Sequence, residues 1–278
     1  MVSSIHTNSA AMSALQQLSK TNSDLETTQG RISSGYKVAG ARDNSSVFAV
    51  AQNVRGDIAA LTSVQTSLDR ANSIADVAIA GGEAISDLLI QMRAAAVAAT
   101  DPSIDGVARA AYNNDFRAYV EQIAVIVNEA EFDGANLLNG SLTNGISFLA
   151  DADASSSLTV DSENMSFAGS ILTFAATASL GTTTLASGMV AALNTSLDNV
   201  NAALGRLGAS ANRLDTHSTF VSKLADSLTS GVGNLVDADL SKESARLQAL
   251  QVKQQLGVQA LQIANQNPQT ILSLFQGG

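Results

Sequence analysis

Two long heptad patterns constrain this chain more than any other feature of its sequence. In residues 47–99, apolar residues recur at alternating spacings of three and four, interrupted only by Asp57 and Gly82. A second pattern of the same kind covers residues 186–235, with Ser218 as its one polar position. Such spacing places apolar side chains along one seam of a helix, and each helix would be roughly 80 Å long at about 1.5 Å per residue. The two seams lie on either side of the chain's middle and predict an antiparallel pair of long helices.

The composition favours a mainly α-helical fold, a long antiparallel helical rod or coiled-coil bundle. The 278 residues include only two prolines, no cysteine and no tryptophan, and aromatic residues make up 4%. Disulfides, thiolate metal ligands and cysteine nucleophiles are therefore absent. The net charge of −10 argues against a nucleic-acid partner, and no apolar run is long enough for membrane insertion.

The segment between the long helices is expected to hold a third helix and a small β-hairpin-rich insertion. Asp101 is expected to cap the third helix and Pro102 to begin it, since proline at the first position loses no hydrogen bond. Residues 132–184 contain Asn-Gly and Asp-Gly turns and short alternating pieces at 146–149 and 158–160. The serine and threonine content of this segment leaves a solvent-facing linker as an alternative.

Both chain ends carry apolar seams that a single copy cannot cover. The rear segment also has apolar residues off its seam, including Val252, Leu256, Val258 and Ile263, so one partner helix is insufficient. Either other copies cover these ends or the ends stay disordered until assembly. The side chains expected to pack in the assembled core are Leu15, Leu18, Leu25, Ile32, Leu247, Leu250, Leu256, Leu261, Ile271, Leu274 and Phe275.

Two polar residues interrupt these terminal seams. Asn22 lies in the front seam and Gln254 in the rear one. A polar residue at a seam position is either a register-setting device or a tolerated defect, and the sequence leaves both readings open.

The sequence indicates no catalytic, cofactor-binding or metal site. The two histidines, His6 and His217, are far apart and have no cysteine companions, whereas a metal site needs three or four converging ligands. The acidic stretch from Asp237 has Lys242 where a calcium loop needs glycine. Without a nucleophile elbow or a phosphate-binding loop, an enzyme is not expected.

Particular stretches resemble bacterial flagellins. They are RISSGYKV at 31–38, ARDN at 41–44, EFDGANLL at 131–138, DADL at 237–240, QALQIANQNP at 259–268 and ILSLF at 271–275. These motifs occur in the family's order and at matching distances from each end. The stretches VGNLVDADL at 232–240 and QQLGVQ at 254–259 are most similar to the short flagellins of α-proteobacteria.

The resemblance implies a structural subunit of the extracellular flagellar filament, the propeller for swimming. Residues 1–42 and 237–278 would form the inner core, 43–131 and 185–236 the surrounding helical layer, and 132–184 a variable insertion. The family is exported unfolded through the flagellar type III apparatus without a cleaved signal peptide. Implied partners are further copies, sibling flagellins, the filament cap and hook-junction proteins, and an export chaperone on residues 240–275. A hook–filament junction protein with flagellin-like termini is the alternative.

One segment departs from the family pattern. Flagellins detected by the vertebrate immune receptor carry an Arg-Val-Arg-Glu-Leu-Ala-Val-like stretch, and here Gln91, Met92, Arg93 and Val97 belong to the sequence QMRAAAV. The acidic and leucine positions are alanine. The resemblance therefore implies only weak receptor recognition.

We expect purified monomer to activate the receptor weakly, because truncation of hot-spot side chains removes most of the binding energy at such sites. A cell-based receptor-reporter assay against a flagellin that keeps the full motif measures the difference. A full-strength response would contradict this prediction.

Overall fold

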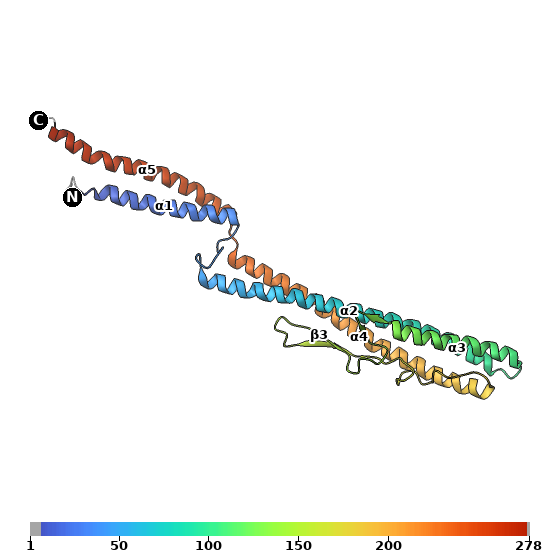
Figure 1. Ribbon diagram of the computed structural model, residues 1–278. Helices are drawn as coiled ribbons and strands as arrows, with labels where there is room; N and C mark the ends of the chain where they lie inside the picture. Colours follow the sequence, from blue (N-terminus) through green and yellow to red (C-terminus); the bar gives the residue numbers. More distant parts are fainter. Residues whose placement is uncertain (1–6, 277–278) are drawn as a thin grey trace. The chain divides into compact units, whose positions relative to one another are not determined.

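The protein is described from a computed structural model, which covers the backbone of residues 7–276 and the side chains of residues 7–266 (Figure 1). Its helices are α1 (Ser9–Ser34), α2 (Ser45–Thr100), α3 (Gly106–Glu129), α4 (Thr183–Val236) and α5 (Leu240–Gln276). Its strands are β1 (Glu131–Phe132), β2 (Ala135–Asn136), β3 (Ile146–Leu149) and β4 (Ser157–Val160). The chain forms two compact units, a terminal unit of residues 1–56 and 227–278 and a central unit of residues 57–226. The mainly helical fold class is confirmed.

The two heptad patterns correspond to the two longest helices. Helix α2 has 56 residues and α4 has 54, and each begins and ends within a few residues of its predicted seam. In the central unit, seam residues such as Leu68 and Met92 of α2 and Leu207 and Leu214 of α4 are buried. The polar seam position, Ser218, accepts a hydrogen bond from Gln65 Nε2 at 2.5 Å, so the interruption is paired across the two helices.

Helix α3 begins later than predicted. Its N-cap is Asp105, which accepts a hydrogen bond from the Ala108 amide at 2.7 Å, so the prediction of a start at Asp101 and Pro102 is wrong. Asp101 instead accepts a hydrogen bond from the Ser103 amide, and this bond lowers the pKa of the carboxyl group. Arg109 donates to the carbonyls of Ala99 and Asp101 and closes the turn between α2 and α3.

The insertion contains the two predicted strand pieces. Strands β3 and β4 pair antiparallel, from Ile146 opposite Val160 to Leu149 opposite Ser157, and β1 and β2 form a smaller hairpin. The predicted hairpin-rich insertion is confirmed, and the linker alternative is wrong. Arg213 of α4 donates to the Thr159 carbonyl and Ser67 Oγ of α2 accepts from the Leu149 amide, so both long helices hold the β3–β4 hairpin.

The stretch between β4 and α4 is irregular but packed. Met165, Leu172, Phe174 and Leu180 in this stretch are buried. Glu163 anchors its first part through two short contacts to Arg206 of α4, 2.6 Å to Nε and 2.7 Å to the terminal nitrogen. The hydrogen bonds and charge of Glu163 raise the pKa of Arg206. This irregular stretch thus covers the central helices, although its sequence has no periodicity that would have predicted its packing.

We expect Arg206→Ala to lower the free energy of unfolding by about 1–2 kcal/mol, because Glu163 stays buried without its cation while the exposed side of the pair is screened by water. Arg93→Ala is the control, because Arg93 is exposed on α2. Urea unfolding of both variants measures the difference, and equal costs would show that the Glu163 contact contributes nothing.

Candidate assembly surface

Helices α1 and α5 form an antiparallel pair within the terminal unit (Figure 1). Asn8 Nδ2 donates to the Ala264 carbonyl at 2.8 Å near the start of α1, and Arg31 contacts Glu243 at 3.2 Å near its end. A residue early in α1 thus contacts one late in α5, and a residue late in α1 contacts one early in α5, so the two helices are antiparallel. Gly35, with φ of +76°, ends α1 and donates its amide to the Arg31 carbonyl.

The two polar interruptions of the terminal seams contact each other. Gln254 Nε2 donates a hydrogen bond to Asn22 Oδ1 at 2.8 Å. This hydrogen bond is lost if either helix shifts by a turn, so the pairing favours the register-setting reading over that of two tolerated defects.

A buried carboxylate lies at the other end of the pair. Glu243 accepts from Arg31 through Oε1, while its second oxygen, Oε2, is buried without a hydrogen-bond partner among the described residues. An unpaired buried carboxylate oxygen costs free energy, so this end of the pair is less stable than its ion pair suggests.

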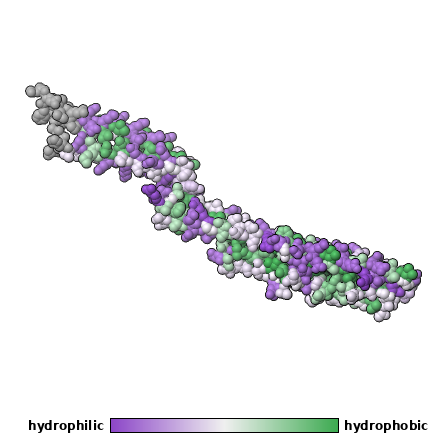
Figure 2. Space-filling model, viewed as in Figure 1, coloured by the Kyte–Doolittle hydropathy of each residue, from purple (hydrophilic) through white to green (hydrophobic). Residues whose placement is uncertain are grey.

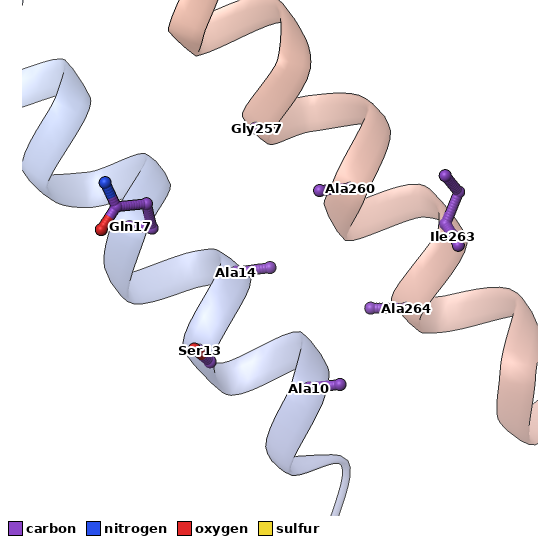
Figure 3. Close-up of a pocket in the computed structure, with 8 residues that line it drawn as sticks. All are labelled: Ala10, Ser13, Ala14, Gln17, Gly257, Ala260, Ile263 and Ala264. Carbon is purple, nitrogen blue, oxygen red and sulfur yellow. The ribbon is translucent and has the colours of Figure 1, made fainter.

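Small residues line the contact between α1 and α5 toward the chain ends. Figure 3 shows Ala10 and Ala14 of α1 pointing toward α5, with Ala260 and Ala264 pointing back. A Cβ placed on Gly257 would lie 3.2 Å from Leu18 Cδ1, so glycine allows this close approach. The four alanines and Gly257, together with Ser13 and Gln17, line a hollow between the two helices.

The helix pair covers most of the predicted core side chains only in part. Leu250 is buried, whereas Leu15 and Leu256 are each 58% exposed. The half-buried members are Leu18, Leu25, Ile32, Leu247 and Leu261. The side chains of Ile271, Leu274 and Phe275 lie outside the described residues. Helix α5 itself continues past Pro268 to Gln276.

A second apolar stripe runs along the face of α5 that points away from α1. Val252, Leu256 and Ile263 are spaced by four and seven residues and share one helix face, and they are 55%, 58% and 64% exposed. On α1, Met12 is 60% exposed one turn before Leu15, a position that the seam analysis missed because it lies off the heptad. Figure 2 shows apolar patches between hydrophilic residues on the terminal helices.

The described residues outside this surface do not form a metal site. Between residues 7 and 276, no three His, Asp or Glu side chains come together as metal ligands would. His217 lies within hydrogen-bond distance of the Ala150 carbonyl, 2.7 Å from Nε2, and so serves the β3–β4 hairpin, while His6 lies outside the described residues. None of the described helices is long and apolar enough to cross a membrane.

Two regions of the chain match the same known family. Residues 5–143 match the bacterial flagellin N-terminal helical region, and residues 190–275 match the bacterial flagellin C-terminal helical region. The chain belongs to the bacterial flagellin family. Its relatives include flagellin FljK of Caulobacter vibrioides, 47% identical over 275 residues, with 99% of both chains covered. A flagellin of Brucella melitensis is 36% identical and is also covered throughout. These α-proteobacterial relatives confirm the resemblance seen in the sequence.

A solved structure shares the fold of this flagellin. A putative flagellar hook-associated protein from Vibrio parahaemolyticus superposes with a TM-score of 0.59 over 70% of this chain and 100% of that chain, at 14% identity. At this identity the likeness shows the fold alone.

The segment that corresponds to the receptor-recognised stretch of other flagellins lies on α2 in the central unit. Gln91 and Arg93 are exposed, Val97 is 50% exposed, and Met92 is buried. The three outward side chains are therefore the ones available to a receptor. The alanines beside them present little contact area.

We expect Gly257→Val to destabilise the α1–α5 pair by about 1–3 kcal/mol, because the added methyl groups overlap Leu18. The same change at Gly30 is the control, since a Cβ there meets nothing within 4 Å and valine favours helix over glycine. Circular dichroism during urea unfolding compares the two variants. A Gly257→Val protein as stable as the Gly30→Val protein would show that the close approach is unimportant.

Proposed function

We propose that this flagellin is a structural subunit that polymerises into the bacterial flagellar filament through its terminal helices. The observation that carries the proposal is the exposed stripe of Val252, Leu256 and Ile263 on the face of α5 opposite α1. Fully covering one such side chain contributes about 1.5–3 kcal/mol, so neighbouring copies gain stability by packing there. Contact between unlike faces of identical copies produces an open filament when the rotation from copy to copy does not close a ring.

The distribution of charge supports crowding of the terminal units. The terminal unit carries eight Lys and Arg against six Asp and Glu, whereas the central unit carries seven against nineteen. Nearly neutral units can approach closely, while the strongly negative central units repel one another and favour water. We infer that residues 1–42 and 237–278 pack at the centre of the filament and that residues 43–131 and 185–236 surround them.

The insertion favours a smooth filament surface. Residues 132–184 form one hairpin of two four-residue strands, a smaller hairpin and a packed irregular stretch that lies on the central helices. This arrangement leaves little room for an adhesive or enzymatic domain. It supports a structural role over a binding module.

The partners follow from the same surface. We infer that the exposed face of α5 within residues 240–275 is what an export chaperone masks before assembly, because apolar stripes of this kind aggregate when left uncovered. Sibling flagellins, the filament cap and the hook-junction proteins would meet the same helices. We infer that the subunit reaches the outside of the cell through the flagellar type III apparatus, without a cleaved signal peptide. Recognition by the vertebrate immune receptor would be weak.

We expect removal of residues 247–278 to abolish polymerisation while leaving the central unit folded, because the deletion removes the exposed stripe but none of residues 57–226. Electron microscopy after seeding measures filament formation, and circular dichroism measures the helix that remains. Full-length protein seeded in parallel is the control.

Two outcomes would contradict the proposal. Normal filaments from the truncated chain would show that the terminal helices are not required. Full-length protein that never extends beyond short caps on its seeds would favour a hook–filament junction protein, which has similar termini but does not form long filaments.

A further inference from the structure

Two Asn-Gly dipeptides lie in the turns of the insertion, Asn139–Gly140 and Asn144–Gly145. In such a pair the backbone nitrogen of glycine can reach the side-chain amide of the preceding asparagine, because no glycine side chain blocks the approach. Reaction requires that the asparagine side chain be free to rotate toward that nitrogen. The two pairs differ in this respect.

The first pair is held in place. Asn139 Oδ1 accepts a hydrogen bond from the Ser141 amide at 2.8 Å, which fixes the orientation of the side-chain amide. The glycines do not distinguish the two pairs, since a Cβ on Gly140 would meet the Asn164 side chain and a Cβ on Gly145 would meet the backbone of Val160. Attack at Asn139 would have to break its hydrogen bond to the Ser141 amide.

The asparagine side chain of the second pair is unrestrained. Asn144 is exposed, and its side chain makes no hydrogen bond to any described residue. The Gly145 amide likewise donates to no group in the described part of the chain. The side-chain amide of Asn144 is therefore free to rotate toward the Gly145 nitrogen, whereas that of Asn139 is held by a hydrogen bond.

We propose that Asn144 is a site of spontaneous deamidation, with water as the only co-reactant. The Gly145 nitrogen attacks Cγ of Asn144 and loses its proton as the new C–N bond forms. The bond from Cγ to the amide nitrogen breaks, and that nitrogen leaves as ammonia. Water then opens the cyclic imide at either carbonyl and yields aspartate or isoaspartate, with no oxidation or reduction at any step.

The product changes both the charge and the geometry of the β3–β4 hairpin. Either product adds a negative charge to a central unit that already carries nineteen acidic residues against seven basic ones. Isoaspartate also adds one methylene to the backbone directly before β3. Gly145 has φ of +69° and lies against the backbone of Val160 and Asp161, so the turn has no room for a longer backbone. Conversion is expected to loosen the pairing of Ile146 with Val160.

The test is peptide mass spectrometry of the folded full-length protein during incubation in mildly alkaline buffer. Deamidation exchanges an NH group for oxygen and so raises the peptide mass. We expect Asn144 to convert about tenfold faster than Asn139, because the hydrogen bond of the Asn139 side chain must first be lost. An isoaspartate-specific methyltransferase with labelled methyl donor should mark the same peptide, and Asn144→Gln should remove the label.

The denatured chain provides the matched control. In denaturant both dipeptides are free, so their rates should become similar, and the rate at Asn139 should rise more than the rate at Asn144. An Asn144 peptide that keeps its mass in the folded protein would overturn the proposal. Equal rates at both sites in the folded protein, or an Asn139 that stays slow in denaturant, would overturn the structural explanation.

Discussion

A pair of helices can cover only one stripe on each of its members, and the terminal unit depends on this limit. Helices α1 and α5 bury Thr21, Thr28, Leu250 and Ala264 between them, but α5 carries a second apolar stripe that α1 cannot reach. Each helix of the pair is therefore stable enough to form, yet its outer face remains in contact with water. The apolar surface of the terminal unit is therefore only partly covered by its own residues, and covering the rest requires another molecule.

In the central unit, further residues of the same unit cover the helix faces that a pair alone would leave exposed. Helix α2 places Gly81 against Leu138, Ala130 and Ile126 and Gly82 against Leu204 and Met165, so different neighbours cover adjacent positions. The third helix and the irregular stretch after β4 supply the extra coverage that long antiparallel helices lack in the terminal unit. The same heptad pattern thus gives a covered core in the central unit and an exposed apolar surface in the terminal unit. The two units also differ in charge, since the central unit is strongly negative and the terminal unit is nearly neutral.

Sequence periodicity predicted the long helices well because the pattern repeats many times, so single exceptions such as Asp57 and Ser218 do not obscure it. It failed where a choice depended on a few local residues. Asp101 and Asp105 are both suitable N-caps, and Arg109 settles the choice by bonding the carbonyls of Ala99 and Asp101. The packed stretch around Met165 and Phe174 has no period at all. Its position depends on contacts such as Arg206 with Glu163, which are distant in sequence.

The candidate surface was only partly visible in the sequence for a similar reason. The apolar residues off the rear seam indicated that one partner helix was insufficient, but their exposure follows from which face of α5 meets α1. That face is specified in part by polar groups, since the Asn22–Gln254 hydrogen bond exists in one register and is lost if either helix slips by a turn. A purely apolar seam would accept several registers with similar energy, and each would rotate a different part of the second stripe toward solvent. Helical spacing already places Val252, Leu256 and Ile263 on one face, and the register held by Asn22 and Gln254 keeps that face directed away from α1, which is the condition for identical copies to pack in the same way.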